Sequence, residues 1–252
     1  MIDPTILHRL RNGVCAVGYL TSPLDEYIKH FPAPGQFQIV GTGFVVREEI
    51  VMTNRHVIDD LESETKQEGI PESQQFLSFA VPRDNTQVLV APRQVRRKYC
   101  LRDGAIDVAF IEFGIVFPEH FENVVPVELD DPRTVRVSEE IAAIGFPHGN
   151  ALLQKNGLVS RWGPVLQQGW VSGISPWELA EPVEFLLDLR TAEGISGSPV
   201  FRQSTGRVLG VLHSRTPDDG PATTAFAQPV SQDLLARWLV EFENDRESSD
   251  YP

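Results

Sequence analysis

Short runs of Val, Ile and Phe, separated by Gly, Pro, Asn and Asp, recur along this chain of 252 residues. Each run has the length of a β-strand, and the separating residues favour turns. Strands do not alternate with helical segments, as a parallel α/β fold requires. The pattern therefore predicts an all-β fold. The expected strands are Val14–Leu20, Gly43–Val46, Ile50–Thr53, Val88–Val90 and Val108–Phe113, followed by Ile141–Gly145, Leu166–Ile174, Phe185–Leu189, Val200–Phe201, Val208–His213 and Thr224–Ala227.

The expected strands fall into two sets of similar size, which predicts two β-barrels within one structural domain. The first barrel is placed at residues 12–116 and the second at residues 135–230. The segment between them, residues 117–134, carries three prolines and an excess of acidic residues. This is the composition of a connection rather than of a core element.

Two further segments have a distinct pattern. Residues 231–243 place Leu and aromatic side chains on one face at helical spacing, and Ser231 is a suitable N-cap. We expect a C-terminal helix that packs on the second barrel. Residues 59–75 are rich in Glu, Gln and Ser, and we expect a surface loop there after a short helical turn.

Composition excludes several classes of partner. The net charge of −13 opposes binding to nucleic acid or to anionic membranes. No apolar run is long enough to span a bilayer, and Asp3, Arg9 and Arg11 interrupt any secretory signal, so we expect a cytoplasmic protein. Cys15 and Cys100 are too few for a disulfide framework, and no His or Cys has the spacing of metal ligands. No cofactor is expected.

The segment Gly194–Pro199 reads Gly-Ile-Ser-Gly-Ser-Pro and lies in a turn between two apolar runs. Amide hydrolysis requires an oxygen nucleophile on a sharply turned backbone, with N–H groups directed at the developing oxyanion. Because Gly194 can adopt angles closed to other residues, its N–H and that of Ser196 are the expected oxyanion hole, with Ser196 as nucleophile. The α/β-hydrolase elbow is disfavoured, since Ser198 stands where that motif requires glycine.

A serine nucleophile needs a base near neutrality and a carboxylate that orients the base. Of the six histidines, only His56 closes a strand-like run. Asp107 stands at the mouth of a strongly apolar strand, where an unpaired charge would be costly. Taken alone, His56 has a surface or core role as its alternative, and Asp107 a turn or cap role. Together with Ser196 they form the predicted catalytic triad.

With its triad in the order His, Asp, Ser, the chain resembles the chymotrypsin-like serine peptidases, and more closely the bacterial glutamyl endopeptidases and high-temperature-requirement proteases. The resemblance implies two six-stranded antiparallel barrels and a cofactor-free endopeptidase acting on proteins or peptides. Ile195 replaces the Asp that binds the freed amino terminus in digestive relatives, so zymogen activation of that kind is not expected. No peptide-binding module is expected after Pro252. The matching strings are Gly41–Val46, Thr53–Val57, Asp107–Ile111, Ala143–Pro147, Gly194–Pro199 and Val208–Val211.

The same resemblance suggests where specificity lies. In glutamyl endopeptidases a Thr five places before the nucleophile and a His on a later strand bind an acidic side chain. Thr191 occupies the first position, Arg190 is adjacent, and either Leu212 or His213 faces the pocket, depending on strand register. A preference for acidic residues is the resulting hypothesis. The alternative function is a protease-like binding or regulatory domain whose cleft is silent or opened by a protein partner.

Overall fold

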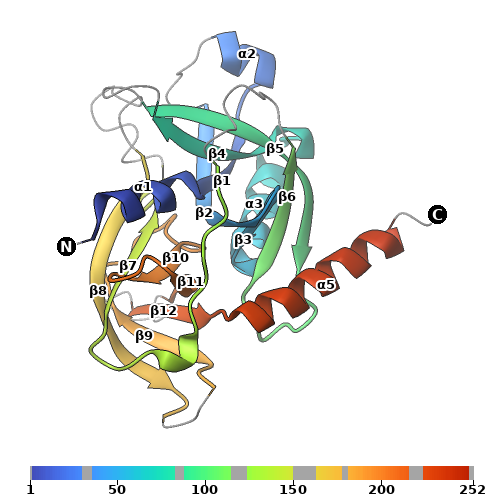
Figure 1. Cartoon of the computed structure of the whole chain (residues 1–252). Helices are drawn as coiled ribbons and strands as arrows, with labels where there is room; N and C mark the ends of the chain where they lie inside the picture. Colours follow the sequence, from blue (N-terminus) through green and yellow to red (C-terminus); the bar gives the residue numbers. More distant parts are fainter. Residues whose placement is uncertain are drawn as a thin grey trace.

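The computed structural model describes residues 2–29, 36–82, 88–114, 124–149, 163–177, 181–215 and 224–249. Two closed antiparallel barrels of six strands each make up the fold (Figure 1), which confirms the predicted fold class. In the first barrel the strand order is β1-β2-β3-β6-β5-β4, and in the second it is β10-β11-β12-β9-β8-β7. The strands are β1 (Val14–Leu20), β2 (Phe37–Arg47), β3 (Ile50–Thr53), β4 (Gln75–Pro82), β5 (Val88–Cys100), β6 (Ala109–Gly114), β7 (Glu140–Gly145), β8 (Val165–Ser175), β9 (Glu184–Asp188), β10 (Pro199–Arg202), β11 (Val208–Arg215) and β12 (Thr224–Pro229).

Each barrel has its own hydrophobic core, and a third cluster joins the two. In β9, for example, Phe185 and Leu187 are buried while Leu186 and Asp188 face outward, as the alternation of a half-buried strand requires. The third cluster combines residues of both barrels, such as Phe44 and Phe201. The barrels are therefore packed directly against each other.

Helices cover parts of this framework. The helices are α1 (Pro4–Asn12), α2 (Leu24–Lys29), α3 (Arg55–Glu68) and α5 (Gln232–Ser249), with 3-10 turns η1 (Glu72–Gln74) and η3 (Pro132–Thr134). The surface loop predicted at residues 59–75 is wrong for most of its length, because α3 continues to Glu68 and ends at the left-handed Gly69. Its buried residues recur at helical spacing among the polar ones. They are Val57, Ile58, Leu61 and Thr65.

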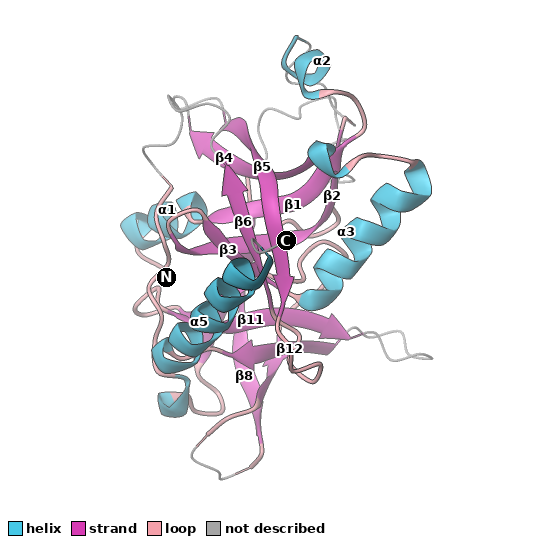
Figure 2. Cartoon of the chain, turned by 90° about the vertical axis from the view of Figure 1, so that its right-hand side faces the viewer, coloured by secondary structure: helices cyan, strands magenta, loops and turns pink. Residues whose placement is uncertain are grey.

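Helix α5 begins where the sequence predicts, since Ser231 Oγ accepts a hydrogen bond from Leu234 N at 3.2 Å. Its far end, however, lies on the first barrel (Figure 2), so the prediction that the helix packs on the second barrel is wrong for that end. The ring of Phe242 contacts that of Tyr99 at 5.9 Å between centroids. The Arg97 guanidinium lies 3.7 Å over the same ring and donates to the Phe242 carbonyl at 2.5 Å. The aromatic anchor thus decides where the helix packs.

Replacing Phe242 by alanine is expected to reduce the free energy of unfolding by about 3–5 kcal/mol, the cost of truncating a buried aromatic side chain. Urea denaturation followed by tryptophan fluorescence measures it. Val240→Ala is the matched control, because Val240 is exposed on the same helix, and it should change stability by less than about 0.5 kcal/mol. Equal effects of the two substitutions would contradict the packing described.

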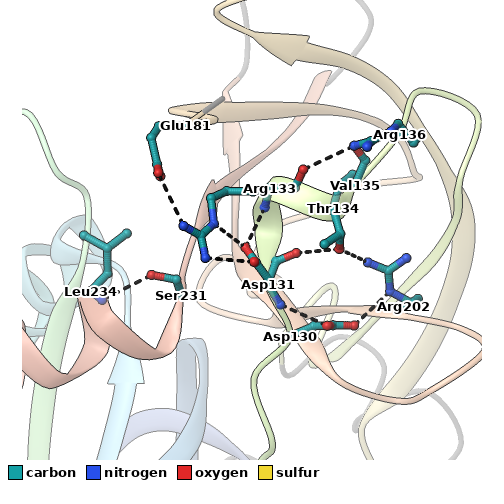
Figure 3. A network of polar contacts seen from close by, with 10 residues as sticks. All are labelled: Asp130, Asp131, Arg133, Thr134, Val135, Arg136, Glu181, Arg202, Ser231 and Leu234. Carbon is teal, nitrogen blue, oxygen red and sulfur yellow. Dashed lines mark hydrogen bonds and ion pairs between the residues drawn. The ribbon is translucent and has the colours of Figure 1, made fainter. Parts of the chain in front are cut away.

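The connection predicted at residues 117–134 is described from residue 124 onward, and residues 117–123 lie outside the described part. Its later half is tied to the second barrel by Arg202 of β10 (Figure 3). The Arg202 guanidinium forms an ion pair with Asp130 at 2.9 Å and donates to Thr134 Oγ1 at 2.8 Å. The connection is therefore held in place beside β10.

Candidate active site

His56 and Asp107 are brought together by the pairing of β3 with β6. His56 lies in the first turn of α3, three residues after the end of β3, and Asp107 lies two residues before the start of β6. The His56 Nδ1 atom is 2.7 Å from Asp107 Oδ2, and the backbone N–H of His56 donates to Asp107 Oδ1 at 3.1 Å. The carboxylate therefore orients the imidazole with one oxygen and caps the helix with the other. Asp107 thus contacts both the ring and the backbone of His56.

The environment of the pair sets its protonation. Burial lowers the pKa of His56, but the hydrogen bond and charge of Asp107, with smaller contributions from Asp60 and Asp59, outweigh it, so the pKa lies above its usual value. Burial raises the pKa of Asp107, but the hydrogen bond and charge of His56 outweigh this, with His213 contributing, so the pKa is lowered. With Asp107 ionised, the neutral imidazole carries its proton on Nδ1, and Nε2 is the proton acceptor.

Ser196 lies in a turn that two glycines make possible. Gly194 has φ +85° and Gly197 has φ +86°, in the left-handed region that favours glycine. A Cβ atom on Gly194 would lie 2.4 Å from the Phe146 carbonyl oxygen, and one on Gly197 would lie 1.9 Å from that of Thr42. Any side chain at either position would therefore distort the turn around Ser196.

The turn that carries Ser196 contacts the first barrel, at the same end of that barrel as His56. The Ser196 carbonyl accepts a hydrogen bond from the backbone N–H of Thr42 on β2 at 2.8 Å. Neighbouring Gly41 separates this turn from α3, because a Cβ there would lie 3.3 Å from Ser196 O and 2.6 Å from Val57 Cγ1. The structure therefore places Ser196 close to the helix turn that carries His56.

Two backbone N–H groups of this turn differ from their neighbours in their hydrogen bonding. All four carbonyls from residue 193 to residue 196 accept hydrogen bonds, and the N–H groups of Ile195 and Gly197 donate to Ala192 and Leu212. Within the described part of the chain, the N–H groups of Gly194 and Ser196 have no acceptor. They are the two donors that the sequence assigns to an oxyanion hole.

The structure separates the candidate specificity residues. Leu212 is fully buried in the core of the second barrel, and His213 lies on the opposite face of β11. The His213 ring stacks on Phe226 with 5.9 Å between centroids, and its Nε2 atom is 3.4 Å from Glu184 Oε1. Of the two alternatives left open by strand register, only His213 faces away from the core.

The other two candidates lie just before the turn that carries Ser196. Arg190 is exposed, while Thr191 is half-buried. Thr191 Oγ1 is buried without a hydrogen-bond partner in the described residues, a state that costs free energy unless a ligand or water supplies the partner. The Thr191 hydroxyl is therefore unpaired within the described residues and covered by neighbouring atoms.

The described residues contain no group of three His, Cys, Asp or Glu side chains arranged to hold a metal ion. A search of the same residues finds no helix with the length and apolar character needed to cross a membrane.

Two packed barrels with a His–Asp pair in one and a glycine-flanked serine turn from the other define the class of chymotrypsin-like peptidases. The sequence profile described as "Trypsin-like peptidase domain" matches residues 41–211, and the chain belongs to this family. The recognition made from the sequence is thereby confirmed.

Individual relatives agree with this assignment. The chain is 29% identical over 205 residues to a "Probable periplasmic serine endoprotease DegP-like" of Brucella suis biovar 1, covering 79% of the chain and 33% of the relative. It is 25% identical over 246 residues to the "Magnetosome formation protease MamE" of Paramagnetospirillum magneticum, covering 92% of the chain and 29% of the relative. The chain thus spans about a third of the length of these relatives.

A solved structure shows the same fold. The crystal structure of Deg5 has a TM-score of 0.55 and 19% sequence identity, and the alignment covers 92% of this chain and 90% of that one. At this identity the likeness concerns the fold, and it supports the two-barrel architecture described above.

The predicted cytoplasmic location is contradicted by these relatives, which are named as periplasmic or as magnetosome formation proteases. The prediction rested on Asp3, Arg9 and Arg11. In the structure Asp3 caps α1, and Arg9 forms an ion pair with Glu128 at 2.6 Å. Asp3 and Arg9 thus have structural roles, which explain charged residues in this segment.

Proposed function

We propose that this chain is a serine endopeptidase in which Ser196 is the nucleophile, His56 the general base and Asp107 the residue that orients the base. The N–H groups of Gly194 and Ser196 form the oxyanion hole. The observation that carries the proposal is the turn around Ser196, where, among the N–H groups of residues 194–198, only these two lack an acceptor in the described residues. The turn is bonded to the barrel that holds the His56–Asp107 pair.

The geometry suits acyl transfer. His56 Nε2 takes the proton of Ser196 Oγ as that oxygen attacks the substrate carbonyl, and Asp107 stabilises the imidazolium that forms. The carbonyl oxygen gains negative charge and is stabilised by the N–H groups of Gly194 and Ser196. His56 then returns the proton to the leaving amine, and water hydrolyses the acyl-enzyme by the reverse sequence of steps. Protein or peptide substrates are supported by the names of the relatives.

The preference for acidic residues and the control by a protein partner, both suggested by the sequence, are supported to different degrees. Acidic preference has Thr191 in its favour, but His213 Nε2 already faces Glu184, so an acidic substrate side chain would have to displace that carboxylate. We therefore leave acidic preference out of the proposed function. Control by a regulatory protein partner is retained as the alternative state of the same cleft.

Treatment with a fluorophosphonate, followed by intact-mass spectrometry, tests the proposal. The wild-type chain should gain one adduct, and Ser196→Ala should gain none, because the reagent phosphonylates activated serines. Ser172→Ala, which removes an exposed hydroxyl of β8, is the control and should react like the wild type. The absence of an adduct on the wild type would favour the silent or partner-gated cleft.

A further inference from the structure

Thr42, on β2 of the first barrel, forms two hydrogen bonds to the turn around Ser196. We propose that Thr42 is a positioning residue, which fixes the peptide groups that follow Gly194 and Ser196 and so aligns the N–H groups of the oxyanion hole. The inference rests on the proposed function. In the sequence, Thr42 stands out only as one residue of the segment Gly41–Val46, which matches the peptidase families.

Thr42 bonds to the turn at two points. Its hydroxyl oxygen is 2.7 Å from the Gly194 carbonyl oxygen, and its backbone N–H donates to the Ser196 carbonyl at 2.8 Å. The residue is completely buried, so water does not compete for these bonds. Thr53 Oγ1 in turn donates to the Thr42 carbonyl at 2.7 Å, which ties Thr42 to the strand that leads to His56.

The direction of the hydroxyl is determined by its neighbours. The backbone N–H of Phe146 points at Thr42 Oγ1 with an N···O distance of 3.0 Å, and an N–H can only donate. The hydroxyl oxygen therefore accepts this bond, and its own hydrogen is directed to the Gly194 carbonyl. A side chain with one donor and one acceptor at the same atom is needed here, which a hydroxyl provides.

Because peptide groups are planar, fixing a carbonyl also fixes the N–H on the opposite side. The two peptide groups that carry the Gly194 and Ser196 N–H groups have their carbonyls on Glu193 and Ile195, which bond to His148 N and Ser198 Oγ, both at 2.6 Å. The two peptide groups that follow them are the ones held by Thr42. All four peptide groups from residue 193 to residue 197 are thus held by hydrogen bonds, and Thr42 holds the second and the fourth.

Gly194 explains why such an anchor matters. Glycine moves easily between backbone conformations, and rotation at Gly194 would turn its N–H away from the oxyanion. The hydroxyl of Thr42 holds the carbonyl of this same residue. Without the bond, the N–H of Gly194 would be aligned in only a fraction of molecules, which would lower turnover without changing how substrate binds in the ground state.

The test compares Thr42→Val, which keeps the shape but loses the hydroxyl, with Thr42→Ser, which keeps the hydroxyl. Thr42→Val is expected to react with fluorophosphonate about 10- to 100-fold more slowly, less than the full loss of an oxyanion donor. On fluorescein-labelled unfolded casein, kcat should fall by the same factor while KM stays constant. Thr42→Ser should remain within about threefold of the wild type, since the hydrogen bonds are retained.

Thr65→Val is the matched control for stability. Thr65 lies on α3 and is also buried, and its hydroxyl donates to Leu61 O at 2.7 Å and accepts from Gln75 Nε2 at 3.1 Å. It should lower the melting temperature like Thr42→Val but react at the wild-type rate. If Thr42→Val does not fold, Thr42→Cys, whose thiol is a weak hydrogen-bond donor, replaces it and should also be slowed.

The outcomes separate this inference from the proposed function. A folded Thr42→Val or Thr42→Cys that reacts at the wild-type rate would overturn the inference alone, as would a Thr42→Ser variant that is slowed as much as Thr42→Val. An increase in KM with constant kcat would also overturn it. A wild-type chain that does not react at all would overturn the proposed function, and this inference with it.

Discussion

Replacing His56 by alanine is expected to lower kcat by about 10⁶-fold, the effect of removing the base from a Ser-His-Asp triad. Without the imidazole, Ser196 keeps a hydroxyl whose proton has no acceptor during attack. Fluorescein-labelled unfolded casein at neutral pH provides the assay. His8→Ala removes an exposed imidazole on α1 and should leave kcat unchanged. A loss of less than about tenfold for His56→Ala would show that another group acts as the base.

The second large effect is expected for Asp107→Asn, which should lower kcat by about 10⁴-fold. An amide that donates to His56 Nδ1 stabilises the wrong tautomer of the imidazole. Because Asn keeps an oxygen that can accept the His56 backbone N–H, the start of α3 should be retained. Far-ultraviolet circular dichroism should therefore match that of the wild type.

The pH profile of kcat/KM makes this expectation more specific. In the wild type, the raised pKa of His56 means that the base stays protonated to higher pH, so the acid limb should have its midpoint above about 6.5. Asp107→Asn removes the carboxylate that raises this pKa, while burial continues to lower it, and the midpoint should move to lower pH. Asp59→Asn, which removes a more distant charge, should move it slightly in the same direction with little change in kcat. A shift to higher pH in Asp107→Asn would contradict the electrostatics described.

Local patterns in the sequence were sufficient for eleven of the twelve strands, β4 being the one that was not predicted, and for the choice of His56 and Asp107 as a pair. The His56 and Asp107 motifs each border a buried strand, and the pairing of β3 with β6 places them together. The glycines around Ser196 predict the sharp turn because few other residues adopt it. These features depend on residues near in sequence or on the alternation of single strands.

What could not be predicted depends on contacts between distant segments. Most residues of α3 are polar, so the helical spacing of its few buried residues is recognised only once the barrel against which they pack is known. The destination of α5 depends on Tyr99, which lies 142 residues before its partner Glu241 on that helix. The bond from Thr42 to Gly194 spans 152 residues, and a single threonine in a strand gives no pattern that would reveal it.

The orientation of the candidate specificity residues also could not be predicted from the sequence, although both lie on a single strand. Whether Leu212 or His213 faces the barrel core depends on a shift of one residue, which the structure decides in favour of Leu212. In the structure Leu212 pairs with Ala227, and His213 pairs with Phe226. The contact between His213 and Glu184 adds a carboxylate from β9 that the sequence does not bring near.

The position of Phe242 has a consequence for how the protein is made. Tyr99 and Phe110 belong to the first barrel, but the ring that covers them is encoded after the whole second barrel. During synthesis the first barrel therefore leaves the ribosome with this aromatic surface open to solvent. It is covered only when α5 has been added, after both halves of the catalytic centre have been translated. The first barrel thus depends for its full packing on a helix that follows the second barrel in sequence.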